Sequence, residues 1–295
     1  MYRYIFTVTA GRSGQATLTY LLKNYVSDCH VSFESPQINY MFCKKHNLPD
    51  QHNGILADLE RHFRRRFVET HELLGRGKVL SAYADNNIEY IKKITRKRIH
   101  IIDAELKKNH KAVYIDVSKH FAKGLHLGFA QLLSEISLIH LVRDPILNMR
   151  SFINRDKNFY LDNGSPDSER NMLRMDKKKM DRSDLYLWAW CETALRYESM
   201  KQLNCVNRHI EIHTDKLNNN NYMSSCLSEI GLNYSAAGEE NVMINTNISS
   251  GYKKTIVSKE DVDKFSRFVD KAQLDLFSKI PYLQSYDPYL IHKIY

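Results

Sequence analysis

A turn containing two glycines, residues 9–14, is the first place in the sequence where anion chemistry could occur. It follows a short apolar stretch, and the apolar spacing over 18–22 predicts a helix directly after it. A turn between a strand and a helix exposes backbone N–H groups at the helix N-terminus, where unpaired donors and the helix dipole favour a phosphate. Gly11 and Gly14 permit the tight turn and a close ligand approach. Arg12 adds a full positive charge and a planar set of donors.

A second anion-binding pattern is the sequence Leu-Val-Arg-Asp-Pro, in which an expected buried strand ends at Arg143. Pro145 then forces a turn and favours the start of a helix. On that helix Ser151 lies one to two turns in, and Arg155 lies four residues later on the same face. We expect Arg143 and Ser151 to converge on one anion beyond the carboxyl end of the strand, where open α/β sheets bind ligands. The alternative is a surface pair of Arg143 and Asp144 with a capping role.

Together the two motifs resemble the sulfotransferase family. That family combines a phosphosulfate loop of the type (K/R)-S-G-(T/S)-(T/S) with a later strand that ends in R-(D/N)-P, followed by Ser and often Arg. The resemblance implies a P-loop-like α/β fold, the sulfuryl donor 3′-phosphoadenosine 5′-phosphosulfate (PAPS), and 3′,5′-adenosine bisphosphate as the product. It assigns the 3′-phosphate to Arg143 and Ser151, and the 5′-phosphosulfate to residues 11–18. The loop residues assigned to the donor are Gly11, Arg12, Ser13, Gly14, Gln15, Ala16 and Thr17.

The sequence departs from the family pattern after Gly14, where Gln-Ala replaces the paired hydroxyl residues and Thr comes next. Hydrogen bonds to the phosphate must therefore come from the backbone, from Gln15 or from Thr17. A late polar segment, Ser-Ser-Gly-Tyr-Lys-Lys, resembles the basic loop with which the family closes over the 3′-phosphate. The resemblance places Lys253 and Lys254 there.

Sulfuryl transfer is an in-line displacement at sulfur, and it needs a base near the acceptor together with positive charge near the departing oxygen. Lys, Arg and backbone donors can supply that charge, so we expect no metal. His120 precedes Arg143 by about the interval of the catalytic histidine in cytosolic sulfotransferases, and Lys119 beside it could assist the leaving group. Glu34 follows the second expected strand, where other branches of the family place a carboxylate base. We prefer His120, because a histidine titrates near neutrality whereas a glutamate needs burial. The alternative for both is an ordinary surface or capping residue.

The elements that must position these residues alternate between strand and helix. Strands are expected at 4–8, 30–33, 112–116, 136–142 and 208–212, and helices at 50–75, 85–109, 148–155 and 184–203. This alternation predicts an α/β fold with a mostly parallel central sheet flanked by helices on both faces. We expect a single domain, 1–295, in which the polar segment 156–183 forms a surface loop or lid.

Charge and cysteine content narrow the class of protein. The formal net charge of +9 favours anionic partners such as a nucleotide, an acidic glycan, nucleic acid or a membrane surface, although it also fits a merely solvated surface. The five cysteines form no CxxC pair, which predicts neither a zinc site nor a disulfide framework and favours a reducing compartment. No signal peptide and no stretch of about 20 apolar residues is expected, so the predicted location is cytoplasmic.

The prediction is a PAPS-dependent sulfotransferase acting on a hydroxyl or amine of a small molecule or glycan, with a carbohydrate preferred by analogy. One alternative is a P-loop kinase-like phosphotransferase, which the missing Lys-Ser/Thr pair of an ATPase loop disfavours. Another is a non-catalytic protein that binds a polyanion or nucleic acid through basic helices such as 61–66. No nucleic-acid-binding signature supports it, so no nucleic-acid partner is expected.

Overall fold

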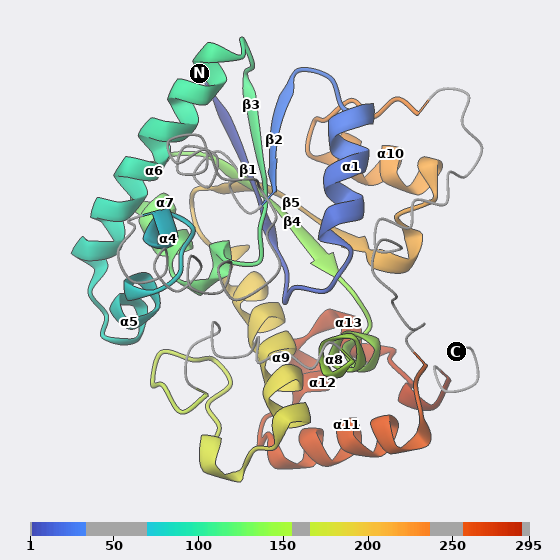
Figure 1. Cartoon of the computed structure of the whole chain (residues 1–295). Helices are drawn as coiled ribbons and strands as arrows, with labels where there is room; N and C mark the ends of the chain where they lie inside the picture. Colours follow the sequence, from blue (N-terminus) through green and yellow to red (C-terminus); the bar gives the residue numbers. More distant parts are fainter. Residues whose placement is uncertain (1, 34–69, 155–165, 237–255, 291–295) are drawn as a thin grey trace, which may run out of the picture.

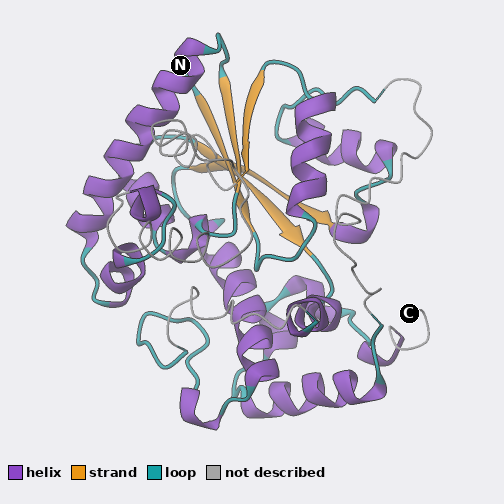
Figure 2. Ribbon diagram, in the orientation of Figure 1, coloured by secondary structure: helices purple, strands orange, loops and turns teal. Residues whose placement is uncertain are grey.

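The computed structural model describes residues 2–33, 70–154, 166–236 and 256–290. Within these ranges five strands form one sheet in the order β2-β3-β1-β4-β5, and every neighbouring pair is parallel (Figures 1 and 2). The strands are β1 (Arg3–Val8), β2 (Cys29–Phe33), β3 (Val113–Val117), β4 (Ile136–Val142) and β5 (Val206–His213). The predicted α/β fold with a parallel sheet flanked by helices is therefore confirmed.

The position of each strand follows from its sequence. Every residue of β3 and β4 is buried, as are the last five residues of β1, because helices cover both faces of the central strands. The edge strand β5 is more polar and alternates only in its second half, where Ile210 and Ile212 point into the core. A continuous apolar run therefore marks a central strand of this sheet.

One face of the sheet is covered by α1 (Gln15–Tyr25) and α10 (Asn220–Glu229), whose apolar side chains share a core cluster with those of the strands. The opposite face is covered by α6 (Ile88–Lys108), α7 (Leu125–Leu132) and the end of α9 (Arg182–Met200). The helix expected after the first turn is confirmed, since Leu18, Leu21 and Leu22 are buried on α1. Two short helices, α4 (Thr70–Leu73) and α5 (Lys78–Ala84), accompany α6.

A further cluster of helices lies beyond the carboxyl ends of the strands (Figure 1). It contains α8 (Pro145–Ile153), the first half of α9, α11 (Lys259–Lys271), α12 (Leu276–Lys279) and α13 (Pro281–Gln284). Helix α8 begins at Pro145, the residue predicted to favour a helix start, and so three residues before the expected range 148–155. The side chain of Asp144 accepts the N–H of Leu147 at 2.8 Å. None of the helices in the described ranges combines the length and apolarity that crossing a membrane requires.

The chain connections create a topological switch point beside β1. The helix that follows β1, α1, lies on one face of the sheet, whereas α7, which follows the neighbouring strand β3, lies on the other face. In open α/β sheets, ligands bind outside the carboxyl ends of strands at such a point. The fold therefore directs attention to the loops that follow β1, β3 and β4.

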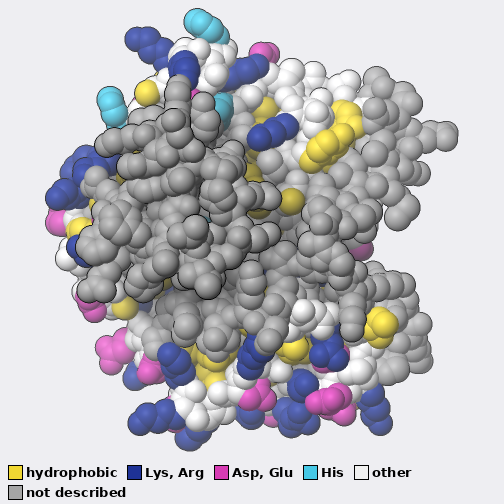
Figure 3. Space-filling model, viewed as in Figure 1, with side chains coloured by type: hydrophobic (Ala, Val, Ile, Leu, Met, Phe, Trp, Pro, Cys, Tyr) yellow, Lys and Arg dark blue, Asp and Glu magenta, His cyan; other side chains and the backbone are white. Residues whose placement is uncertain are grey.

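Among the described residues on the face that Figure 3 shows, charged side chains lie in several places rather than in one region. Figure 3 shows Lys and Arg side chains along α6 on the left and around α9 and α11 at the bottom, interspersed with Asp and Glu. Surface charges of mixed sign favour solubility and do not by themselves mark a binding site. The positive groups that matter for a site are those held at the carboxyl edge of the sheet.

Candidate functional site

The turn between β1 and α1 has the geometry of an anion-binding turn. Gly11, Arg12 and Gly14 all have left-handed backbone angles, with φ of 84°, 54° and 80°. A Cβ atom on Gly14 would lie 2.8 Å from Leu217 Cδ1, and one on Gly11 would lie 3.1 Å from Lys119 Cδ. Gly14 caps α1 without a side-chain hydrogen bond. Glycine is thus required at both positions, and no capping side chain competes for the N–H groups of the first helical turn.

Two side chains from distant parts of the sequence, and one from the turn itself, hold this turn. Asn148 on α8 donates from Nδ2 to the carbonyl oxygen of Gly11 at 2.7 Å and to Ser13 Oγ at 3.2 Å. Ser13 Oγ also donates to the Gly11 carbonyl at 3.1 Å. Thr214, just after β5, donates to the Ser13 carbonyl at 2.8 Å and shares its hydroxyl with the carbonyl of Val142. The turn is therefore fixed between α8 and the ends of β4 and β5.

Sequence reasoning missed the roles of Asn148 and Thr214. Asn148 lies between Arg143 and Ser151 in the second motif, and this position could have indicated that it belongs to the site. Thr214 lies two residues after the predicted strand 208–212, near the edge where polar residues of a parallel sheet gather.

The two predicted anion motifs meet in the structure. Arg12 Nε donates to Ser151 Oγ at 3.2 Å, and Arg143 Nη1 donates to the carbonyl oxygen of Arg12 at 3.0 Å. The carbonyl of Arg143 in turn accepts Trp190 Nε1 at 2.8 Å. Burial lowers the pKa of the Arg12 guanidinium, the direction expected of a cation withdrawn from water. Arg12 is 131 residues from Arg143 and 139 residues from Ser151 in the sequence. The structure thus brings residues of both motifs into one site.

The predicted base and its neighbour follow β3 at the same edge. The side chain of Lys119 passes over Gly11, the glycine of the first motif. His120 is fully buried, and its backbone N–H donates to Ser118 Oγ at 3.1 Å. Its two ring nitrogens have no hydrogen-bond partner among the described residues. Burial first, and then Lys123, Lys119 and Arg76, hold the pKa of His120 well below its usual range. The ring is therefore neutral near pH 7 and does not titrate near neutrality as predicted, because burial and the neighbouring cations disfavour its charged form. A neutral ring can still accept a proton.

The structure gives fewer contacts, or none, for the other predicted site residues. Gln15 is buried, and its Nε2 atom has no partner within the described ranges, whereas Ala16 and Thr17 are partly exposed in the first turn of α1. Four predicted site residues and the basic stretch 61–66 lie outside the described residues. The four residues are Glu34, Arg155, Lys253 and Lys254.

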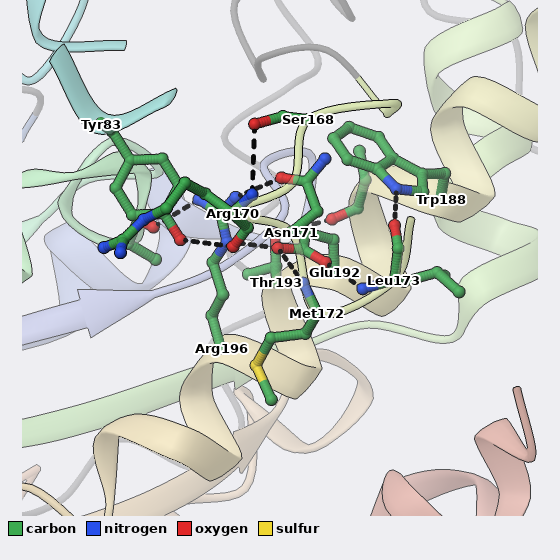
Figure 4. A network of polar contacts seen from close by, with 12 residues as sticks. Tyr83, Ser168, Arg170, Asn171, Met172, Leu173, Trp188, Glu192, Thr193 and Arg196 are labelled. Atoms are coloured by element: carbon green, nitrogen blue, oxygen red, sulfur yellow. Dashed lines mark hydrogen bonds and ion pairs between the residues drawn. The ribbon is translucent and has the colours of Figure 1, made fainter. Parts of the chain in front are cut away.

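The described part of the predicted surface loop is attached to α9 (Figure 4). Glu192 accepts the backbone N–H groups of Met172 and Leu173 at 3.3 and 2.8 Å, and Trp188 Nε1 donates to the Leu173 carbonyl at 2.8 Å. Arg196 donates to Glu192 at 2.6 Å and to the side chain of Asn171 at 3.0 Å. Residues 166–181 lack long regular elements, as predicted, but Leu173 is buried rather than exposed. These bonds bring this segment beside the carboxyl edge.

Among the described residues, no group of three His, Cys, Asp or Glu side chains is placed to hold a metal ion. The fold and the site define an α/β protein whose parallel sheet carries a glycine turn facing two arginines. The sequence matches no model of a known protein family, and no curated protein matches it.

Proposed function

We propose that the protein is a sulfotransferase that moves a sulfuryl group from PAPS to a hydroxyl or amine, with a glycan as the expected acceptor. The observation that supports this most is the contact between the two anion motifs, made by Arg12 with Ser151 and by Arg143 with the Arg12 carbonyl. A donor with two anionic groups needs two such positions on one side of the sheet. PAPS has that property, and ATP lacks the 3′-phosphate.

In this proposal the turn at 11–17 binds the 5′-phosphosulfate through backbone N–H groups at the start of α1. Arg143 and Ser151 bind the 3′-phosphate, because a guanidinium and a hydroxyl both donate to phosphate oxygens. Arg12 lies between the two positions. The fixed geometry of the turn, held by Asn148, means that little ordering is needed when the donor binds.

The transfer step follows from the same placement. The acceptor oxygen or nitrogen attacks sulfur and forms the new bond, while the bond from sulfur to the bridging phosphate oxygen breaks. Its electrons stay with 3′,5′-adenosine bisphosphate, and Lys119 beside Gly11 offsets the negative charge that develops there. His120, neutral and buried, accepts the acceptor's proton.

Thermal-shift measurements with 3′,5′-adenosine bisphosphate, AMP and Mg²⁺-ATP test the donor site. We expect strong stabilisation by the bisphosphate alone, and loss of most of it in Arg143→Met and Ser151→Ala. Arg267→Met is the matched control, because Arg267 is exposed on α11. Equal stabilisation by Mg²⁺-ATP would instead favour a kinase-like phosphotransferase. Salt-sensitive nucleic-acid binding without a bisphosphate effect would favour the polyanion-binding alternative.

Turnover of PAPS in His120→Gln and Glu34→Gln separates the two candidate bases. We expect His120→Gln to lose about 10²–10⁴-fold in kcat, the usual contribution of a general base, while bisphosphate binding is retained. Full turnover of His120→Gln would remove this histidine from the mechanism without affecting the donor-site assignment.

A further inference from the structure

Basic side chains gather around one aromatic ring beside His120. The ring of Tyr83 on α5 has the guanidinium of Arg196 4.5 Å from its centroid and that of Arg170 at 5.3 Å. The imidazole of His126 on α7 lies 5.9 Å from the same ring. Tyr83 also donates its hydroxyl to the Arg170 carbonyl at 3.2 Å (Figure 4). We call Tyr83, His126, Arg170 and Arg196 the Tyr83 cluster.

Within the Tyr83 cluster, Arg196 has a structural role. It is buried, and it bonds to Glu192 at 2.6 Å, to the carbonyl of Ala122 at 2.9 Å and to Asn171 at 3.0 Å. Glu192 balances its charge and holds the backbone at 172–173 at the same time. Arg196 therefore needs no ligand to account for its position.

Arg170 and the histidines differ from Arg196 in this respect. Arg170 Nε, His126 Nδ1 and both ring nitrogens of His120 are buried and have no hydrogen-bond partner in the described ranges. His120 is fully buried and His126 is 6% exposed, so water does not readily replace the missing partners. Leaving such a group unpaired costs on the order of 1–3 kcal/mol, and folded proteins contain few of them. Several together indicate a ligand that supplies the missing partners.

The charge at this position specifies the kind of ligand. Burial first, then Arg196 and Arg170, lower the pKa of His126 to about 3, and Lys123, Lys119 and Arg76 act on His120 in the same direction. Two carboxylates form ion pairs in this region, Asp116 with Arg98 and Glu192 with Arg196. Arg170 forms no ion pair with a carboxylate of the described residues, and its positive charge therefore favours an anion.

The Tyr83 cluster lies next to the proposed reaction centre. We call residues 11–17, the proposed binding site of the sulfuryl donor, the donor turn. Lys119 contacts the donor turn at Gly11, and His120 follows Lys119 in the chain. Phe121, the next residue, places its ring 6.3 Å from that of His126. Residues 119–121 thus connect the donor turn with the Tyr83 cluster, and on this basis we assign the cluster to the acceptor's side of the base.

We propose that Arg170 binds an anionic group of the acceptor and His126 a neighbouring hydroxyl, and that the acceptor is an acidic sugar bearing a carboxylate or a phosphate ester. Naming this ligand as the acceptor rests on the proposed function, whereas the anion site itself rests on the Tyr83 cluster. A carboxylate or phosphate offers an acceptor oxygen to Arg170 Nε, whereas the neutral ring of His126, already hydrogen-bonded to the backbone of Phe121, accepts a hydroxyl of the same sugar at Nδ1.

Isothermal titration with D-glucuronate, D-glucose 6-phosphate and neutral D-glucose tests the site. Saturating 3′,5′-adenosine bisphosphate blocks the donor turn during the titration, and a parallel titration omits it. We expect the wild type to bind an acidic sugar and not glucose. Arg170→Met should raise the Kd of that sugar roughly 10- to 100-fold, as the loss of a charge-assisted hydrogen bond predicts.

The matched control is Arg174→Met, because Arg174 lies four residues away in the same segment with its side chain 62% exposed. It should bind the acidic sugar as the wild type does. His126→Gln on α7 gives a second test that does not depend on the folding of the Arg170 variant. The inference is wrong if glucose binds as tightly as the acidic sugars, or if both Arg170→Met and His126→Gln keep the wild-type Kd. Absence of bisphosphate binding by the wild type would refute the proposed function instead, and the titration without nucleotide would still test the anion site.

Discussion

Replacing Asn148 tests whether its side chain holds the donor turn. Its Nδ2 group donates to the Gly11 carbonyl at 2.7 Å and to Ser13 Oγ at 3.2 Å, and the residue is fully buried. Asn148→Ala removes both bonds and a little buried volume. Asn148→Asp keeps the volume but replaces the donor with an acceptor, so that it opposes the Gly11 carbonyl.

The expected size of the effect follows from these contacts. Each buried neutral hydrogen bond contributes about 1 kcal/mol, so Asn148→Ala should lower the free energy of unfolding by roughly 2 kcal/mol. Ser13 Oγ still donates to the Gly11 carbonyl, which limits the loss. Asn148→Asp should cost at least as much, because it sets like partial charges against each other and buries a carboxylate. If ordering the turn then costs about 1.4 kcal/mol of binding free energy, the Kd of the bisphosphate rises tenfold.

Urea unfolding followed by circular dichroism measures the first effect, and titration with 3′,5′-adenosine bisphosphate measures the second. Asn154→Ala is the control, since Asn154 is exposed at the end of the same helix. The reasoning fails if Asn148→Ala changes neither quantity more than Asn154→Ala does. Loss of stability without loss of bisphosphate affinity would keep the structural role and remove the link to the donor.

Two further predictions concern other parts of the fold. Gly128→Ala on α7 should lower the free energy of unfolding by about 1–3 kcal/mol in urea titrations, because the new Cβ would lie 2.1 Å from Thr95 Oγ1 and 2.8 Å from Thr95 Cβ. An unchanged or raised stability would mean that α6 and α7 adjust freely. Burial raises the pKa of Asp144 from 3.8 to about 6, so the folded state binds a proton more tightly than the unfolded chain and stability falls as pH rises from about 4 to 6. Asp144→Asn keeps a capping oxygen, and its free energy of unfolding should exceed that of the wild type by about 1–2 kcal/mol at pH 7 but not at pH 4. This figure is reduced because Asp144 is partly exposed. A variant as stable as the wild type at both pH values would contradict the prediction.

The strands and the first helix were predictable because their signals are local. A run such as Ile136–Val142 is mostly apolar, with Ser137 and His140 as its two polar residues, and this is enough to recognise a strand that is buried on both faces. The turn after β1 was also visible, since glycines are needed where the backbone is left-handed. The start of α8 was indicated by Pro145 itself, whereas apolar spacing placed the helix only from residue 148.

The candidate site was only partly predictable. Its glycine turn, Arg143 and Ser151 have recognisable spacing, and in the structure Arg12 contacts both Ser151 and Arg143. That Arg143 and Ser151 bind one anion stays a prediction. Asn148 and Thr214 lack such spacing, because an isolated polar residue has the same appearance in a sequence whether it holds a loop or faces water. The burial of His120 depends on what packs over it, which no local pattern encodes.

The sequence by itself thus determined the parallel sheet and the residue types at its carboxyl edge, because apolar runs, glycines and prolines act over a few neighbouring positions. Only the tertiary structure decided which polar groups meet. Thr214 reaches Ser13 across 201 residues, and Arg170 joins His126 around Tyr83, because helices on both faces return to one edge of the sheet. Burial at this edge removes water from the polar groups, and it is this burial, which local sequence does not encode, that makes them a candidate site.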